Sequence, residues 1–355
     1  MERAYQTARE FVHCSTNRFP VMGYRRPRFL TVATGADNFA PGFAGGHERR
    51  STRVPYDCIV CVKQVPDTAN ITVQAMKEDG TVNRAALPAI FNPDDLYALE
   101  AALEVRDRYG GTVSVLTMGP PKAADVLREC LYRGADRVIL LTDRRAAASD
   151  TLATSYILSQ AVKTLKRYDF VFCGRQAIDG DTAQVGPQLA EKLGIPQVTY
   201  LEQLIEVRDR TARVRRNVGN GWEVVEVRLP VLLTVLDTAP KPRPPAAKRV
   251  MKYKHARARV ELEAIVKGSV GTPADVEREV ERLAEGLRAR GLMIEQWNLD
   301  DIRADLTWCG LHGSPTWVHR IQAIVLTKQG YTEIPPTEEG IRGLIRELVV
   351  DHTLG

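Results

Sequence analysis

Short β-rich runs alternate with longer helical stretches between residues 57 and 197, and this alternation restricts the fold more than any other feature. Four such runs lie at residues 57–62, 112–116, 137–141 and 169–173. In the intervening stretches, spacings such as that of Leu96, Leu99 and Leu103 place apolar side chains on one helical face. The pattern predicts an α/β fold, a Rossmann-like parallel sheet with helices on both faces. Ligands of such sheets bind at the carboxyl ends of the strands.

A different pattern follows residue 196. Two alternating runs, 212–218 and 224–229, flank Asn220-Gly221 and predict a β-hairpin, and Pro230 then begins another apolar run that ends at residue 236. Four prolines among basic residues prevent a regular helix over most of residues 237–254. We expect this segment to be an extended, exposed arm.

Two amphipathic helices are predicted near the C-terminus. Thr272-Pro273 supplies an N-cap and a proline at the first helical position, and an apolar stripe from Val276 to Leu287 follows. The last helix begins near Thr337, and its apolar face consists of Ile341, Leu344, Ile345 and Leu348. That face packs either on a partner or on its own domain.

Charge and composition indicate an ordinary globular protein. The formal charge is +5, but residues 1–53 hold nine Arg and four acids, so the remainder is formally neutral and gives no sign of a nucleic-acid partner. We interpret residues 1–53 as a disordered or mis-annotated extension; an organellar transit peptide is the alternative. No apolar run approaches the roughly 20 residues needed to cross a bilayer, and we expect a cytoplasmic protein.

Six scattered cysteines argue against a disulfide framework. Cys58 and Cys61 have the spacing of a thiol redox motif, but they lie inside an apolar run, where a strand directs residues three apart to opposite faces. We therefore expect buried thiols. A thiol oxidoreductase stays an alternative that burial of both side chains would exclude.

The run from Gly174 to Leu193 follows a predicted strand and leads into a helix. Asp181 is suited to cap that helix, and the free amides of residues 182–184 would then face a ligand such as phosphate. Asp179 and Asp181 would repel a pyrophosphate, so we expect them to cap the helix or to accept hydrogen bonds from ribose or adenine. A tight turn without a ligand is the alternative.

Three more loops follow strands or begin helices, at residues 91–95, 117–121 and 149–154. Their convergence on one rim of the sheet would suit an extended dinucleotide. We find no Gly-x-Ser-x-Gly, Walker or His-Glu-x-x-His motif, and this favours a protein whose chemistry belongs to its cofactor.

Five ordered blocks resemble the beta subunits of electron-transfer flavoproteins. They are Cys61-Val-Lys-Gln-Val-Pro-Asp-Thr68, the Asn92-Pro93 loop with Tyr97-Ala-Leu-Glu100, Thr117-Met-Gly-Pro-Pro121, Ser149-Asp-Thr-Leu-Ala-Thr-Ser155 and the 174–187 block. The resemblance covers about residues 57–260 and resumes at Cys309-Gly-Leu-His-Gly-Ser-Pro-Thr316. It implies a nucleotide-binding domain over 54–262, including the recognition arm, and a helical insertion with a C-terminal arm over 263–355 that contacts the alpha subunit.

Within that family, the sequence is similar to the electron-bifurcating, nitrogen-fixation-associated (FixA-like) branch. Ordinary members hold AMP and have acids at the positions of Gly180 and Asp181, whereas the bifurcating ones read Asp-Gly-Asp-Thr-Ala-Gln-Val-Gly-Pro, as here. A glycine removes bulk and charge near the phosphates, which suits FAD. The resemblance implies that NADH delivers two electrons, one of which reaches ferredoxin or flavodoxin and the other a high-potential acceptor.

The resemblance also implies the positions of the cofactor-binding residues. They are Cys61, Asn92, Asp95, Met118, Gly119, Asp150, Thr151, Thr154, Ala177, Ile178, Asp179, Gly180, Asp181, Thr182, Ala183, Gln184, Val185 and Gly186. Partner recognition falls to Ala239, Pro242, Arg243, Met251 and Lys252. No catalytic side chain and no metal ligand is expected.

Two departures from the family pattern bear on the partners. Ala239 stands where ordinary members present an anchoring leucine, which argues against an acyl-CoA dehydrogenase of the usual kind. The resemblance implies a quinone oxidoreductase or an acyl-CoA-dehydrogenase-type protein as the high-potential partner. A helical insertion at about residues 266–298 could enlarge an interface or only decorate the surface. Two alternatives remain: a conventional beta subunit that holds structural AMP, and an adenylate-binding regulatory module.

Overall fold

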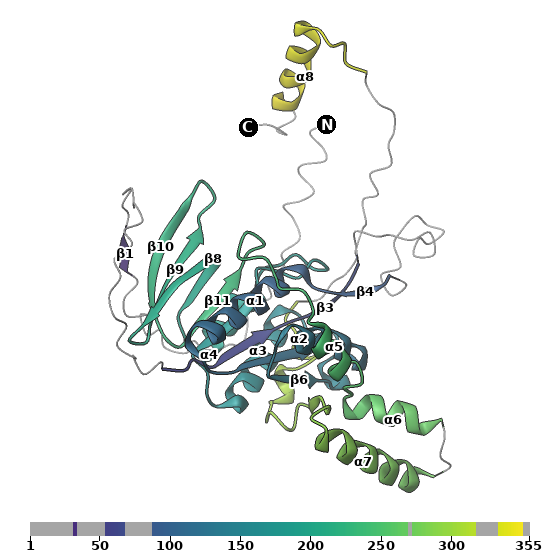
Figure 1. Ribbon diagram of the computed structural model, residues 1–355. Coiled ribbons are helices and arrows are strands. Elements are labelled where there is room, and N and C mark those ends of the chain that lie inside the picture. Colours follow the sequence, from purple (N-terminus) through teal and green to yellow (C-terminus); the bar gives the residue numbers. More distant parts are fainter. Residues whose placement is uncertain (1–30, 34–53, 68–86, 269–271, 317–332, 351–355) are drawn as a thin grey trace.

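The computed structural model describes residues 31–33, 54–67, 87–268, 272–316 and 333–350. Within them, ten strands form one sheet in the order β1-β10-β9-β8-β11-β7-β2-β5-β6-β12 (Figure 1). Its strands are β1 (Thr31–Ala33), β2 (Cys58–Cys61), β5 (Val113–Met118), β6 (Arg137–Leu141), β7 (Phe170–Gly174), β8 (Gln197–Arg208), β9 (Thr211–Asn217), β10 (Trp222–Arg228), β11 (Val231–Val235) and β12 (Glu295–Trp297). The strands from β8 to β12 in this order are parallel, and β9, β10 and β1 extend the sheet in antiparallel fashion.

Helices cover both faces of the parallel part, as the sequence predicts. On one face α1 (Pro93–Tyr109) and α2 (Ala124–Arg133) pack on a core that includes Val60, Val115 and Phe172. On the other face α3 (Thr151–Leu165) and α4 (Val185–Leu193) pack on Ile59, Leu116 and Val171. Adjacent residues of one strand thus enter different cores, because a strand alternates its side chains between faces. Both faces are buried, and this explains the continuous apolar runs of these strands.

The predicted hairpin is confirmed by β9 and β10, which flank Asn220-Gly221, and the predicted run after Pro230 forms β11. β8, which the sequence analysis did not predict, joins this hairpin to the parallel strands. The described residues also contain β1, where no strand was expected, and a small sheet of β3 (Gln64–Pro66) and β4 (Ala89–Phe91). Apart from β1, the expectation for residues 1–53 lies outside the described residues.

The predicted arm is only partly extended. Residues 237–246 contain no helix, but α5 (Ala247–Tyr253) follows and packs against α2. The prediction of an extended backbone is therefore wrong for α5, because its residues follow the last proline of the run and are free to form helical hydrogen bonds. The expected exposure holds, since none of the residues of α5 is buried.

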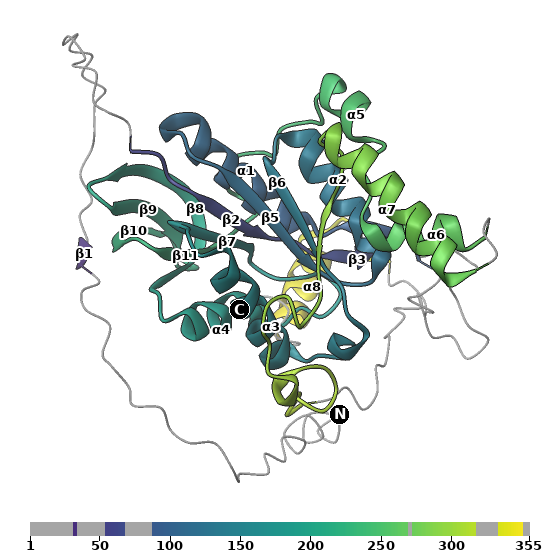
Figure 2. The same ribbon diagram turned by 90° about the horizontal axis from the view of Figure 1, so that it is seen from below.

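The predicted helix after Thr272 is confirmed by α7 (Pro273–Ala289), whose N-cap hydroxyl accepts a hydrogen bond from the amide of Asp275. α7 packs on α6 (Arg259–Lys267) through a small core that includes Leu262 and Val280, and the pair projects from one end of the sheet (Figure 2). The expected boundary at residues 262/263 falls inside α6. β12 then returns the chain to the sheet beside β6, so the expectation of a wholly helical insertion over about residues 266–298 is wrong at its end.

The last helix, α8 (Glu338–Val350), lies away from the sheet (Figure 1). None of its residues is buried, and Ile341 and Ile345 are 53% and 50% exposed. Its apolar face has no covering element within the described part of the chain. Among the described residues, no helix is both long and apolar enough to cross a membrane.

Candidate functional site

The sheet has its topological switch point between β2 and β7. These strands are parallel neighbours, and Cys61 pairs with Cys173 at their carboxyl ends. After β2 the chain leads to α1 on one face, whereas after β7 it leads to α4 on the opposite face. Such a divergence leaves a crevice beyond the strand ends, where open α/β sheets bind their ligands. The candidate site is this crevice and the rim beside it.

Asn92 and Asp95, at the start of α1, hold the two loops that border the crevice. The Asn92 amide nitrogen donates to the carbonyl of Gln176 at 2.8 Å, and its oxygen accepts from the amide of Ile178 at 3.2 Å. The Asp95 carboxylate accepts from the amides of Lys63 at 2.8 Å and Gly174 at 3.0 Å. Both side chains are buried. The structure thus places these two predicted site residues beneath the loops, where they fix the backbone of the site.

Burial makes Asp95 a weaker acid than an exposed aspartate. Removal of the carboxylate from water raises the pKa of Asp95 to about 7, although hydrogen bonds from Lys63, Asn92 and Gly174 act in the opposite direction. Gly174 has no space for a side chain here, because a Cβ would lie 2.4 Å from Asp95 Oδ1. The contact between α1 and β7 is therefore close at this point.

The loop between β7 and α4 holds the predicted binding residues from Ala177 to Gln184. Lys63 Nζ lies 2.7 Å from the Asp179 carboxylate, and Gln176 Nε2 donates to Asp181 Oδ1 at 2.9 Å. The ion pair offsets part of the negative charge that would otherwise repel a pyrophosphate. Gly180, between the two acids, is exposed, and an added Cβ would meet nothing within 4 Å.

The prediction that Asp181 caps the following helix is wrong. α4 begins at Val185 with Gln184 as its N-cap residue, so its free first amides belong to Val185 and Gly186, since Pro187 has none. The physical reason lies in the loop backbone, where Asp181 and Ala183 adopt positive φ values of 50° and 53°. This conformation delays the helix and directs Asp181 to Gln176.

The N-terminus of α3 meets that of α4 at the rim. The Thr151 hydroxyl donates to Gln184 Oε1 at 2.8 Å, which joins the first residue of α3 to the N-cap of α4. Asp150 caps α3 by accepting from the amide of Ala153 at 2.9 Å. Two adjacent helix N-termini supply partial positive charge and unpaired amides, a suitable environment for phosphate.

The loop 309–316 is attached to this same place. Asp150 Oδ2 accepts from the amide and hydroxyl of Thr316 at 3.0 and 2.7 Å, and Ser314 Oγ accepts from the Asp150 amide at 2.8 Å. The Ser149 hydroxyl accepts from the amide of Gly310 at 3.1 Å. Asp150 therefore attaches the 309–316 loop to the start of α3. This brings Ser314 and Thr316 to the site, and the sequence indicated them only as part of a family motif.

The remaining predicted residues lie around the crevice. Met118 ends β5 and Gly119 follows it, with its amide bonded to the carbonyl of Leu141 at 3.0 Å. Thr154 lies in the first turn of α3. Lys63 also belongs to the site but was absent from the predicted set; its position directly after the strand of Cys61 was the available signal.

Burial excludes the thiol oxidoreductase alternative. Cys58 is 1% exposed and Cys61 is 8% exposed, and they enter different cores, as predicted for a strand. Burial raises the pKa of the Cys58 thiol well above its ordinary value, so the reactive thiolate is disfavoured. Within the described residues, no cluster of His, Cys, Asp and Glu could hold a metal ion.

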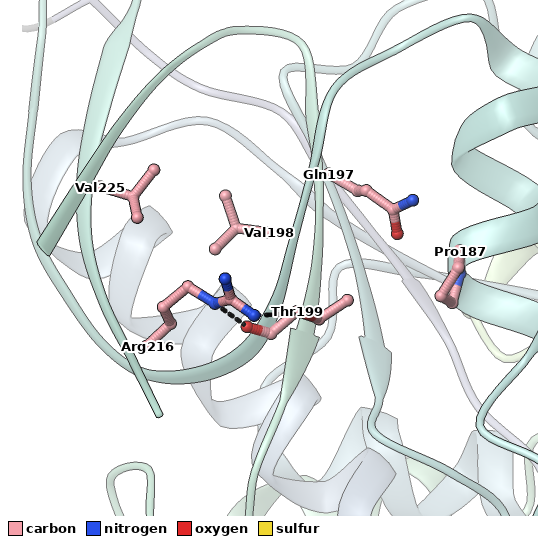
Figure 3. A pocket seen from close by; sticks show the side chains of 6 residues that line it. All are labelled: Pro187, Gln197, Val198, Thr199, Arg216 and Val225. Carbon is pink, nitrogen blue, oxygen red and sulfur yellow. Dashed lines mark hydrogen bonds between the residues drawn. The ribbon is translucent and has the colours of Figure 1, made fainter. Parts of the chain in front are cut away.

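A separate pocket of about 260 Å³ lies between the start of α4 and the antiparallel strands (Figure 3). It is lined by Pro187, Gln197, Val198, Thr199, Arg216 and Val225, none of which is a predicted site residue. Arg216 is already used there, because its guanidinium donates to the carbonyl and hydroxyl of Thr199 and to Glu223. This pocket is apart from the crevice between β2 and β7.

Some of the predicted recognition residues pack against the rest of the protein, and others are exposed to solvent. Ala239 is buried, and Arg243 donates to the buried carboxylate of Glu100 at 2.9 Å and pairs with Asp107 at 2.9 Å. Pro242 is half-buried. Met251, in contrast, is 64% exposed on α5, beside the exposed Lys252.

Comparison with known proteins agrees with this architecture. The family model described as "Electron transfer flavoprotein domain" matches residues 79–260. An electron transfer flavoprotein subunit beta of Clostridium acetobutylicum is 41% identical over 294 residues, which cover 83% of this chain and 98% of that protein. Protein FixA of Sinorhizobium fredii is 41% identical, covering 82% and 91%, and the caffeyl-CoA reductase-Etf complex subunit CarD of Acetobacterium woodii is 43% identical, covering 74% and 86%. The chain therefore belongs to the electron transfer flavoprotein family, as a beta-type subunit of the group that includes FixA.

Proposed function

We propose that this chain binds FAD at the crevice between β2 and β7 and, joined to an alpha subunit, takes part in flavin-based electron bifurcation. In this proposal the heterodimer accepts two electrons from NADH. One passes to a low-potential acceptor, ferredoxin or flavodoxin, and the other to a high-potential one such as a quinone oxidoreductase. FAD supplies the electron-carrying chemistry when bound, and the protein supplies binding, orientation and electrostatics.

The observation that supports FAD most directly is the surroundings of Gly180. An added Cβ would meet nothing within 4 Å, and the φ angle of this residue is not in the left-handed region. Neither packing nor backbone conformation within the described chain therefore requires a glycine. Gly174 and Gly186 differ, since a Cβ there would lie 2.4 Å from Asp95 Oδ1 and 2.8 Å from Thr234 Cγ2. We infer that Gly180 leaves space for a ligand.

The two helix N-termini fit the phosphates of such a ligand. The free amides of Val185 and Gly186 on α4, and those of Thr151 and Leu152 on α3, begin helices that a hydrogen bond joins at the rim. The amides of both helix starts would hold a pyrophosphate, at the place where the 309–316 loop is attached to Asp150. AMP, with one phosphate, needs only one of the two helix starts.

The relatives and α8 support an assembly with an alpha subunit. One relative is named as part of a caffeyl-CoA reductase-Etf complex and another as a subunit beta, so both are components of larger proteins. The exposed apolar face of α8 would cover apolar surface on such a subunit. The proposed location is the cytoplasm. The family match favours electron transfer over an adenylate-binding regulatory module.

The decisive experiment counts the cofactors. The chain is co-expressed with its candidate alpha subunit, the complex is purified, and FAD and AMP are quantified per heterodimer after denaturation. We expect two FAD, no AMP, and bleaching of the flavin absorbance by NADH. One FAD and one AMP per heterodimer would contradict the FAD proposal and assign the chain as a conventional beta subunit with structural AMP.

A further inference from the structure

An ion pair spans the crevice at the switch point. Lys63, in the loop after β2, places its Nζ 2.8 and 2.7 Å from the two carboxylate oxygens of Asp179, in the loop after β7. The two side chains are 48% and 23% exposed. The ion pair therefore joins the loop after β2 to the loop after β7 across the crevice, and it is partly exposed to solvent.

The backbone at both ends of this ion pair is held independently by buried groups. Asp95 accepts from the Lys63 amide, and the Lys63 carbonyl accepts from the amide of Asn92 at 3.0 Å. The Asn92 side chain holds Gln176 and Ile178, which precede Asp179. Consequently, the ion pair can break while the buried frame stays in place.

The segment that follows Asp179 stores backbone strain. Asp181 and Ala183 have positive φ values although neither is glycine, and such conformations persist only where surrounding contacts impose them. Side-chain contacts that restrain the segment include Lys63 with Asp179, Gln176 with Asp181, and Thr151 with Gln184. The first of them joins the loop after β7 to the loop after β2.

We propose that Lys63 is a latch residue: its ion pair with Asp179 holds the 175–184 loop closed over a bound adenine nucleotide and slows nucleotide release. The inference rests on the proposed function, which places that nucleotide in the crevice. The same ion pair neutralises Asp179 beside the phosphates, so it reduces repulsion while it closes the loop. Lys63 is thus a positioning residue that acts through Asp179.

The test measures nucleotide release from the complex with the alpha subunit. The parent complex and the variants Lys63→Met, Asp179→Asn and Lys63→Met/Asp179→Asn are loaded with tritiated FAD or tritiated AMP in separate arms. Loss of label into excess unlabelled nucleotide is then followed. We expect each single variant to release nucleotide roughly twofold to fivefold faster, which is the effect of an exposed ion pair, and the double variant to be no faster than either. The exchanged pair Lys63→Asp/Asp179→Lys should restore slow release.

Salt gives a second readout. Added salt screens exposed charges, so release from the parent should accelerate toward the rate of Lys63→Met, whereas release from that variant should change little. Lys267→Met removes another exposed lysine, at the end of α6, and should behave as the parent. Thermal melting of each complex identifies any variant that alters the fold.

Two results would overturn the latch. If Lys63→Met and Asp179→Asn change release in opposite directions, Lys63 binds phosphate directly and Asp179 only repels it. If neither variant changes the rate, the ion pair has no part in retention. A parent complex that holds no adenine nucleotide would contradict the proposed function as well, so the two failures are distinguishable.

Discussion

Asp95 is the titratable group whose burial has the clearest consequence for stability. Its pKa is about 7 in the folded protein, above the ordinary value of 3.8 that the unfolded chain is expected to have. The folded state therefore holds a proton that the unfolded state has lost between these values, and stability falls as pH rises from about 4 to about 7. The slope is at most ~1.4 kcal/mol per pH unit. Above pH 7 this contribution no longer changes.

Asp95→Asn tests that assignment. The variant should unfold at lower urea concentration, because an amide cannot accept from both backbone N–H groups, with a cost of ~1–3 kcal/mol. The decline of the urea midpoint between pH 4 and 7 should also become shallower than in the parent complex. Asp209→Asn, which removes a carboxylate whose side chain is 91% exposed, serves as the control. Parallel pH profiles for parent and Asp95→Asn would refute the raised pKa.

Gly174, the last residue of β7, and Gly180, in the loop that follows, form a matched pair of glycines. Gly180→Asp should change the free energy of unfolding by less than ~0.5 kcal/mol, because open space surrounds the added side chain. It should nevertheless shift the bound nucleotide of the purified heterodimer from FAD toward AMP. Gly174→Ala should cost ~1–3 kcal/mol instead, since its Cβ would meet Asp95 and Asp94. Unchanged FAD content in Gly180→Asp would remove the main support for a ligand at this position.

At the scale of elements, the sequence predicted β2, β5, β6 and β7 well because each is a short, continuous apolar run between helical stretches. β8 escaped prediction for a physical reason. Its buried residues, Val198, Leu201, Leu204 and Val207, recur every third position, which resembles a helix more than a strand. Register shifts at 201/203 and 204/206 each add a residue and break the alternation. Likewise, the start of α4 could not be read from the sequence, because positive φ angles at two non-glycine residues have no sequence signature.

α8 permits a prediction about assembly. Ile341→Asp/Ile345→Asp places charges on its exposed apolar face and should leave the rest of the chain folded, since no described element covers that face. Loss of two buried isoleucines from an interface should weaken binding of the alpha subunit at least about 10-fold. Isothermal titration calorimetry or analytical ultracentrifugation would measure the dissociation constant of the heterodimer. Arg346→Asp, a charge reversal on the polar face, should bind as the parent does; equal weakening by both variants would contradict docking through the apolar face.

At the scale of the whole molecule, the arm after β11 has an anchored half and an exposed half, which the sequence could not separate. Residues such as Pro242 and Arg243 indicated an exposed recognition segment, but Arg243 lies against α1 and neutralises the buried Glu100. A long-range contact of this kind depends on the tertiary fold and leaves no local pattern. The part available to a partner is therefore α5, where Met251 and Lys252 are exposed.

This division predicts opposite phenotypes for two substitutions in one arm. Arg243→Ala leaves Glu100 buried without its cation and should lower the free energy of unfolding by ~3 kcal/mol. Met251→Ala removes an exposed side chain and should leave the urea midpoint unchanged, while it slows electron transfer from the reduced heterodimer to its acceptor. Stopped-flow absorbance with flavodoxin as acceptor would measure that rate. The reverse outcome, a destabilised Met251→Ala and a normally folded Arg243→Ala that transfers electrons slowly, would assign recognition to the anchored half of the arm and not to α5.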